Sequence, residues 1–498
     1  MTLAVQTQAS EIVNPMVNEQ QTLVIGIDVG TSGVRAVAAS AAGEVQAEAE
    51  HPLSSDRRDT SGVHEQSPED WWSAVCQSTR KIIKSLNESG RRNYVAGVAV
   101  TSTSGTLVVT GPAGRPLRPA LLYDDSRGGE IAAMLNSQAA PGTPRLNASQ
   151  SLVKAAWVQQ TEPAVWARAR YLLHPADWLT GKLTGEFGLS DYSDSLKLGY
   201  ELESGAWSEA VRRAGIPSEL LPRIYRPGEQ VGAVSSAAAR ETNLPPGTPV
   251  LAGATDGIAS LIASGASQPG DANTTLGTTI VWKALATNRP RITGGIYCHL
   301  HPSGLWAPGA ASNTGMGSLR VRQPGLSVTE MDHLAAAYLP NPIVCYLLAG
   351  RGERFPFLNS QAETFLEGDT REPAEQHAAE LQSIGFAERW GYEVLAGCGV
   401  EVGDKVFSTG AAATSGVLSQ LRSNVLRRVV VRAQHGTAAF GAAILAASGT
   451  IYAGDVPGAI QTMTKVAESF QPTSASAKQY DEIYGRFRQA CTRRGYGA

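Results

Sequence analysis

A short apolar strand followed by a turn rich in glycine and hydroxyl residues occurs near the start of the chain, and a weaker copy occurs past its midpoint. The first copy is the apolar run 23–28 followed by Gly30-Thr31-Ser32-Gly33, and the second is Leu276-Gly277-Thr278-Thr279 between two strand-like runs. Either short match alone carries little weight, but each one opens a segment of domain size. The pair therefore predicts an internal duplication, with two domains of related fold.

The length of the chain also favours two domains. At 498 residues, 42% of them apolar, it exceeds the usual size of one hydrophobic core and can fill two. The turn-rich stretch Ser267-Gln268-Pro269-Gly270 predicts the boundary. We therefore expect a disordered tail over residues 1–20, a first domain over residues 21–266, a second domain over residues 267–498, and a cleft between the two domains.

The first domain shows a mixed α/β pattern. Residues 34–39 and 45–50 are typical of strands, with a hairpin turn at Ala42-Gly43 between them. Ser67-Pro68-Glu69-Asp70 predicts an N-cap and the start of a helix that runs to about residue 87, and residues 95–100 form a further buried strand. Three strands, a helix and a fourth strand predict one half of a ribonuclease-H-like unit.

Charge, cysteine content and hydropathy exclude several classes of protein. The net charge of −3 argues against nucleic acid or an anionic membrane as the main partner. Five scattered cysteines without a CxxC pair do not form a disulfide framework. No run of about 18 apolar residues and no leader-like start is present, so we expect a cytoplasmic protein with a small-molecule partner and no membrane partner.

Two glycine- and hydroxyl-rich turns are candidate phosphate sites. Around Asp28, glycines allow close approach to a polyanion, hydroxyls and amides donate hydrogen bonds, and the carboxylate suits a hydrated cation. An ordinary hairpin explains this segment equally well. Residues 274–279 offer a second candidate, for which a threonine-rich strand is the alternative. The P-loop pattern GxxxxGK[ST] is absent from the sequence.

Asp256 lies between a strand-like run over residues 250–253 and a helix predicted over residues 258–266. A carboxylate at such a sheet edge is placed to accept a proton from an alcohol during phosphoryl transfer. From local sequence alone, the alternative that Asp256 caps its helix is favoured.

Two further segments are rich in small residues. Residues 309–317 permit a flat base or a phosphate tail to lie against the backbone, and they equally suit a closely packed helix start. Residues 408–415 follow a strand-like run and precede a helical stretch, where a nucleotide often meets a helix N-terminus. A plain strand-to-helix turn is the alternative there.

Taken together and in this order, from about residue 23 to residue 491, these segments resemble the FGGY family of carbohydrate kinases. The resemblance implies an actin-like, duplicated ribonuclease-H fold, with a sugar-binding first domain and a second domain that binds ATP and ends in a C-terminal helix. Asp256 matches the catalytic base and a substrate contact, and Asp28 matches a substrate contact that also holds Mg²⁺ through water. The implied ATP and phosphate contacts are Gly30, Thr31, Ser32, Thr275, Gly277, Thr278, Thr279, Gly309, Asn313, Gly410, Ala411 and Ser415.

Several segments look most similar to the D-ribulose kinase branch, which plant xylulokinase-like proteins join. They are residues 103–106, 122–125, 190–192 and 196–200, and they imply that Ser104 contacts the sugar. Two positions depart from the family pattern. The adenosine loop GGGxxN or GGGxxS is Gly410-Ala411-Ala412-Ala413-Thr414-Ser415 here, so added methyl groups crowd adenosine if the backbone needs positive φ. Thr101 stands where the branch often has an acidic residue, which puts sugar preference in question.

The expected function is therefore ATP-dependent phosphorylation of a small ketose, D-ribulose before D-xylulose or a polyol, by a monomer or homodimer. Two alternatives come from other classes. One is an actin-like binding protein with impaired ATP use, motivated by the altered adenosine loop. The other is an actin-like ATPase that acts on protein partners. The presence of both Asp28 and Asp256 favours the kinase over both alternatives.

Overall fold

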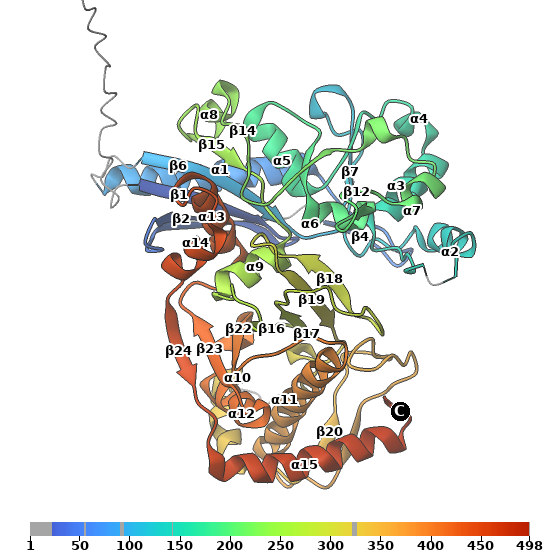
Figure 1. Cartoon of the computed structure of the whole chain (residues 1–498), viewed down its shortest axis with the longest axis vertical. Helices are drawn as coiled ribbons and strands as arrows, with labels where there is room; N and C mark the ends of the chain where they lie inside the picture. Colours follow the sequence, from blue (N-terminus) through green and yellow to red (C-terminus); the bar gives the residue numbers. More distant parts are fainter. Residues whose placement is uncertain (1–21, 54–55, 90–93, 142, 321–325, 498) are drawn as a thin grey trace, which may run out of the picture.

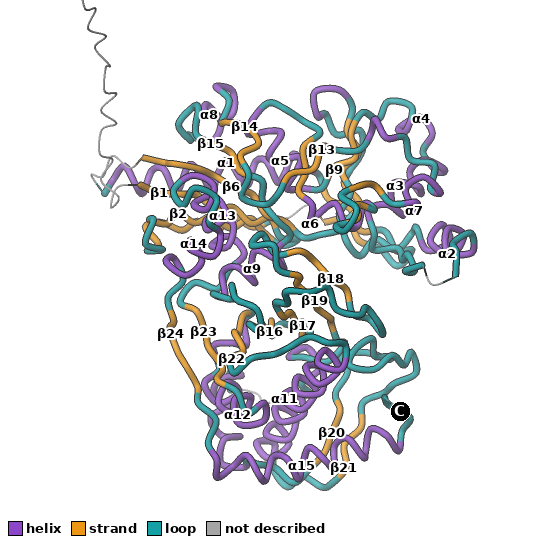
Figure 2. Tube along the Cα trace, viewed as in Figure 1, coloured by secondary structure: helices purple, strands orange, loops and turns teal. Residues whose placement is uncertain are grey.

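The computed structural model describes residues 22–53, 56–89, 94–141, 143–320 and 326–497. The predicted disordered tail over residues 1–20 lies outside these ranges. Two units are stacked along the long axis of the molecule, and each contains a central sheet with helices around it (Figures 1 and 2). The fold is the predicted α/β arrangement of two ribonuclease-H-like units.

The first sheet has the strand order β14-β15-β6-β1-β2-β3, in which β1, β2 and β3 are antiparallel neighbours and β6 and β15 run parallel to β1. The strands are β1 (Thr22–Val29), β2 (Gly33–Ser40), β3 (Val45–Pro52), β6 (Tyr94–Ser102), β14 (Gln230–Ala233) and β15 (Pro249–Leu251). The four strands expected from the start of the sequence are thus confirmed, and Gly43 turns between β2 and β3 with φ of +83°.

The second sheet has the order β18-β19-β17-β16-β22-β23-β24. Its strands are β16 (Ala272–Leu276), β17 (Ile280–Ala284), β18 (Tyr297–Leu300), β19 (Trp306–Ala311), β22 (Lys405–Thr409), β23 (Val429–Ala433) and β24 (Val466–Phe470). Here β19, β17 and β16 are antiparallel, β22 and β23 are parallel to β16, and β24 is antiparallel. Apart from the added β18, this repeats the first sheet strand by strand, as the repeated turn motif predicts.

Helices cover both faces of the first sheet, so the side chains on both sides of its central strands are buried. Helix α1 (Pro68–Glu88) covers one face with Trp71 and Ile82, which pack with Ile25. Ser67 occupies the predicted N-cap, but its side chain makes no capping hydrogen bond. Helix α13 (Ala438–Thr450), which follows the second sheet in the chain, covers the other face beside β1 and β6 (Figure 1).

Gly26 of β1 permits the close approach of α13, because a Cβ there would lie 1.9 Å from the Ala439 carbonyl oxygen. The predicted boundary at residue 267 falls between the strands of the two sheets, and α13 packs across it. The position of the boundary between two independently folding domains therefore stays a prediction.

The remaining helices and short strands build the walls around the two sheets. In the first unit they are β4 (Asp56–Arg58), β5 (His64–Gln66), β7 (Val108–Thr110), β8 (Ala120–Leu121), α2 (Gly129–Ser137), α3 (Ser151–Thr161), α4 (Pro163–Trp166), β9 (Tyr171–Leu173), α5 (Pro175–Thr184), β10 (Leu189–Asp191), α6 (Tyr192–Ser195), β11 (Tyr200–Glu201), β12 (Ala206–Trp207), α7 (Glu209–Arg213), β13 (Arg223–Tyr225), α8 (Ser236–Thr242) and α9 (Asp256–Ser264). In the second they are α10 (Val328–Ala335), β20 (Val344–Tyr346), β21 (Phe365–Glu367), α11 (Pro373–Gly397), α12 (Gly416–Leu426) and α15 (Ser474–Arg493). Helix α14 (Val456–Met463) packs on α13 beside the first sheet (Figure 1). Among the helices of the described ranges, none has the length and apolar character needed to cross a membrane.

Candidate active site

A cavity of about 1180 Å³ lies between the two units, and six of the predicted site residues line it. The first unit contributes Asp28 at the end of β1, Ser104 after β6, and Asp256 at the start of α9. The second unit contributes three more, which are Thr275, Gly410 and Ala411. The carboxylates of Asp28 and Asp256 in the first unit therefore share one cavity with the loops at Thr275 and Gly410 in the second unit.

The other predicted site residues do not line this cavity, although their turns flank it. They are Gly30, Thr31, Ser32, Gly277, Thr278, Thr279, Gly309, Asn313 and Ser415. Part of their hydrogen-bonding capacity is used within the protein. The Asn313 side chain donates to the Gly352 carbonyl, and the Ser415 hydroxyl caps α12 by accepting from the Leu418 amide. Contacts from these residues to a nucleotide stay predictions.

Gly309 has a structural reason for lacking a side chain. It pairs with Lys283 between β17 and β19, and a Cβ at this position would lie 2.6 Å from the Trp282 carbonyl oxygen. The small residue therefore permits two strands to pack closely.

Asp256 is the first residue of α9, two residues earlier than the helix start that the sequence predicts. Thr255 is extended at the N-cap, and Gly265 ends the helix with φ of +98°. The Gly257 amide donates a hydrogen bond of 2.7 Å to Oδ1 of Asp256. Burial raises the pKa of Asp256, and the Gly257 amide, Lys197 and Lys283 oppose that rise. The Asp256 carboxylate thus accepts a hydrogen bond at the start of its helix and also lines the cavity.

Asp28 has a buried oxygen, Oδ1, with no hydrogen-bond partner among the described residues. Burial and the negative charge of Asp256 raise its pKa to about 7, against the lowering effect of Arg35. Two carboxylates in one cavity disfavour each other's ionisation unless a cation or a donor compensates them. An orphaned carboxylate oxygen is also the type of ligand that Mg²⁺ prefers, so this site fits the ion.

Lys154 on α3 supports the Ser104 loop, and the sequence analysis missed it. It is 1% exposed, and its Nζ donates to the carbonyls of Gly105, Tyr123 and Ser149 at 2.9, 3.2 and 3.0 Å. Burial lowers its pKa to about 7. A single lysine inside the apolar run of residues 151–158 was the available signal, because lysine is rarely buried without partners.

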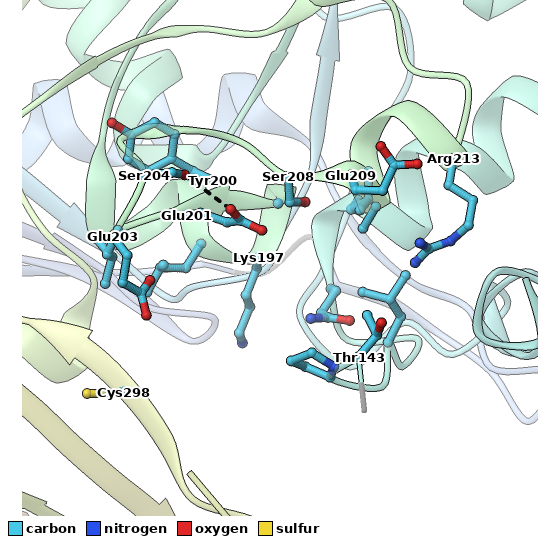
Figure 3. A pocket seen from close by; sticks show the side chains of 18 of the residues that line it. Thr143, Lys197, Tyr200, Glu201, Glu203, Ser204, Ser208, Glu209, Arg213 and Cys298 are labelled. Atoms are coloured by element: carbon cyan, nitrogen blue, oxygen red, sulfur yellow. Dashed lines mark hydrogen bonds between the residues drawn. The ribbon is translucent and has the colours of Figure 1, made fainter. Parts of the chain in front are cut away.

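Two further lysines approach Asp256, one from each unit. Lys197 follows α6 and donates to the Ser104 carbonyl at 3.3 Å, whereas Lys283 lies on β17. Lys197 also borders a second pocket of about 750 Å³, which shares Cys298 with the central cavity. Figure 3 shows Lys197 projecting from the first unit into the space between this wall and the strand that carries Cys298.

The altered adenosine loop is not strained. Only Gly410 has positive φ, at +89°, and a Cβ there would lie 2.4 Å from the Leu276 carbonyl oxygen. Residues 411–414 form a short 3₁₀ helix, and none of them has positive φ. The condition under which the extra methyl groups would crowd the site therefore does not hold at these positions.

Thr101 does not line the cavity. It is fully buried, and its hydroxyl donates to the Ala254 carbonyl, two residues before Asp256. The threonine that departs from the family pattern thus holds the backbone of the loop that leads to Asp256.

Glu353 is a buried carboxylate in the charged loop over residues 350–356. This side chain is 2% exposed and accepts hydrogen bonds from the Ser312 hydroxyl, the Asn313 amide and the Tyr346 hydroxyl, each at 2.7 Å. Arg354 lines the cavity and donates to the Ser312 carbonyl at 3.1 Å. The loop therefore holds the small-residue segment after β19 in place.

The comparisons with known proteins agree over nearly the whole chain. Residues 23–263 match the N-terminal domain and residues 276–450 the C-terminal domain of the FGGY family of carbohydrate kinases. The xylulose kinase of Staphylococcus epidermidis is 26% identical over 483 residues, which cover 93% of this chain and 95% of that protein. The xylulose kinase of Streptomyces rubiginosus is 30% identical over 342 residues, which cover 64% and 68%.

A solved structure of xylulose kinase from Rhodospirillum rubrum has a TM-score of 0.84 and 26% identity, and the match covers 95% of this chain and 98% of that one. The structure of Plasmodium falciparum glycerol kinase has a TM-score of 0.84 at 15% identity, which shows the shared fold alone. With both of its domains matched and a cleft between two duplicated sheets, this chain belongs to the FGGY family of carbohydrate kinases and is a sugar kinase.

Proposed function

We propose that this sugar kinase transfers a phosphoryl group from ATP to a ketopentose, with D-xylulose as the first candidate. The observation that carries the proposal is the single cavity lined by Asp28, Ser104 and Asp256 on one side and Thr275 and Gly410 on the other. The relatives and one solved structure named as xylulose kinases support the choice of sugar. D-Ribulose is the second candidate, favoured by the resemblance of residues 190–200 to the D-ribulose kinase branch.

In this proposal Asp256 is the general base. It accepts the proton of the acceptor hydroxyl as the oxygen attacks phosphorus, while Ser104 and Asp28 hold other oxygen atoms of the sugar. A base works best when its pKa lies near the working pH, and burial raises the pKa of Asp256 in that direction. The positive charges of Lys197 and Lys283 keep the carboxylate able to ionise.

The nucleotide is proposed to lie on the second unit. Its phosphates would meet the turn residues Gly30 to Ser32 and the facing turn that follows Thr275, with adenosine near Gly410 and Ala411. Asp28 would hold Mg²⁺ through the water shell of the ion, and bound Mg²⁺ neutralises charge on the phosphates. Closure of the two units around the ligands excludes water and limits wasteful hydrolysis.

The test is a coupled assay of ADP release with D-xylulose, D-ribulose, ribitol and other polyols, on the wild type and on Asp256→Asn and Asp256→Ala. We expect one sugar to stimulate ADP release strongly, and the variants to lose about 100- to 10,000-fold in kcat. ADP affinity measured by calorimetry should stay within about threefold of wild type in both variants.

Asp455→Asn is the matched control, because Asp455 also stands at a helix start, capping α14 through the Gly458 amide, and does not line the cavity. It should keep full activity. Sugar-independent ATP hydrolysis in the wild type would favour a protein-directed ATPase, and no nucleotide binding at millimolar concentration would favour a binding protein. Full turnover by Asp256→Asn would remove Asp256 from the role of base.

A further inference from the structure

Lys283 is a buried cation that makes no direct ion pair among the described residues, although the negative charge of Asp256 acts on it across the cavity. It is 5% exposed, and among the described residues its ammonium has neither an ion pair nor a hydrogen bond. Its one polar contact is with the face of the Tyr297 ring, 5.1 Å from the ring centroid. A buried charge is costly unless it is paired, and burial lowers the pKa of Lys283 to about 8 even though the nearby charge of Asp256 opposes that fall.

The other fully buried lysine and arginine side chains in the described part of the chain are compensated. Lys154 donates to three backbone carbonyls, and Arg422 pairs with Glu388 through two hydrogen bonds of 2.6 and 2.7 Å. Lys283 therefore differs from both in retaining free donors, and those donors line the cavity. An anionic ligand in the cavity would supply the missing partner.

The position of Lys283 fits an anion that lies next to Asp256. Its Nζ is 3.7 Å from the point that a Cβ on Gly257 would occupy, so it reaches across from the second unit to the start of α9. The strand β17 that carries it begins directly after the predicted phosphate turn at Thr278 and Thr279. Lys197 differs, because it belongs to the first unit and donates to the Ser104 carbonyl on the sugar side.

We propose that Lys283 is a catalytic residue that binds the oxygen atoms of the phosphoryl group while it moves from ATP to the acceptor hydroxyl. In this step a bond forms between the hydroxyl oxygen and phosphorus, and the bond between phosphorus and the ADP oxygen breaks. Asp256 takes the hydroxyl proton, and Lys283 stays protonated and gives up no proton. The assignment rests on the proposed function, and it adds the Lys283 ammonium of the second unit to the residues that take part in the reaction.

This assignment gives Lys283 and Lys197 different roles in the same cavity. Lys283 meets charge that develops on the transferring group, whereas Lys197 orients the Ser104 side of the sugar site. Removing a donor aimed at developing charge mainly lowers kcat, and removing a ground-state sugar contact mainly raises KM. The two substitutions should therefore separate kinetically.

The first experiment compares Lys283→Met, which removes the charge but keeps an unbranched side chain one atom shorter, with Lys283→Arg, which keeps the charge. We expect Lys283→Met to lose about 100- to 1,000-fold in kcat with KM for the sugar little changed, and Lys283→Arg to recover part of that loss. Lys197→Met should raise KM for the sugar more than it lowers kcat. Lys182→Met, which removes a lysine that packs over Trp72 and does not line the cavity, should have wild-type kinetics.

The second experiment needs no turnover. Calorimetry measures the affinity for ADP with Mg²⁺, alone and with aluminium fluoride, which imitates the phosphoryl group in transfer. We expect Lys283→Met to bind ADP alone within about threefold of wild type and to lose most of the added affinity from aluminium fluoride. Lys283→Gln replaces Lys283→Met if thermal unfolding shows that the methionine variant does not fold.

The two proposals fail separately. If the wild type phosphorylates no sugar, the proposed function fails, while the aluminium fluoride measurement still reports on Lys283. If Lys283→Met or Lys283→Gln keeps the wild-type kcat and the full aluminium fluoride effect, Lys283 has no part in the transfer. An equal loss in the methionine and arginine variants, with unchanged aluminium fluoride affinity, would also overturn the assignment.

Discussion

The buried ion pair between Arg422 on α12 and Glu388 on α11 should be the most sensitive point of the second unit. Both side chains are fully buried. Arg422 also donates to the Ser408 hydroxyl at 2.6 Å, and the Thr274 hydroxyl donates to Glu388 at 2.5 Å. The network therefore joins two helices to β16 and β22, whose ends carry Thr275 and Gly410 into the cavity.

Replacing Arg422 with methionine leaves the Glu388 carboxylate buried with the Thr274 hydroxyl as its remaining side-chain donor. Breaking a buried pair from one side costs about 3–5 kcal/mol of the free energy of unfolding. For a unit of this size each kcal/mol lowers the melting temperature by about 2–4 °C, so we expect a fall of about 6–20 °C. The joint variant Glu388→Met with Arg422→Met should lose much less, because no unpaired charge remains.

Differential scanning calorimetry measures this effect, with Arg493→Met as the control. Arg493 pairs with Glu367 at 2.8 Å, but its side chain is 59% exposed, so its loss should cost less than about 1 kcal/mol. Equal melting temperatures for Arg422→Met and Arg493→Met would refute the reasoning. So would a joint variant whose loss equals the sum of the two single losses.

Three further predictions concern the walls of the cleft. Gly410→Ala should weaken ATP binding and lower stability, because φ is +89° and the added Cβ would meet the Leu276 carbonyl, whereas Ala412→Gly should bind ATP normally by calorimetry. Lys154→Met should raise KM for the sugar, because three carbonyls around the Ser104 loop lose their donor, and unchanged sugar KM would contradict this. Burial and neighbouring carboxylates raise the pKa of Asp194 well above its usual value, so the folded protein should lose stability as pH rises toward that pKa, and Asp194→Asn should flatten the dependence of melting temperature on pH.

Local sequence was sufficient where neighbouring residues decide the structure. The apolar run ending at Asp28, the turn at Gly43 and the helix after Ser67 follow from strand alternation, positive φ at glycine and a proline in the first helical turn. The repeated turn also predicted the second sheet, because a duplicated segment meets the same packing requirements and forms the same strand order.

Motif composition was a weaker guide to which residues face the ligand. Gly309 and Asn313 lie in a small-residue segment that suits a nucleotide, yet one permits close strand packing and the other donates to the Gly352 carbonyl. Glycine and asparagine serve packing, turns and ligands alike, so the pattern alone did not separate these uses.

The sequence alone determined the two-unit α/β architecture and the carboxylates at the ends of their strands, because strand pattern and turn chemistry are local properties. Only the tertiary structure decided that Asp28 and Asp256 share a cavity and that Lys197 and Lys283 approach Asp256 from opposite units. Residues 28, 197, 256 and 283 are far apart in the chain, and the packing of two sheets sets which of their charges meet. A lysine has no local pattern that shows whether its charge will be buried, so the cation on the second-unit wall became visible only in the folded chain.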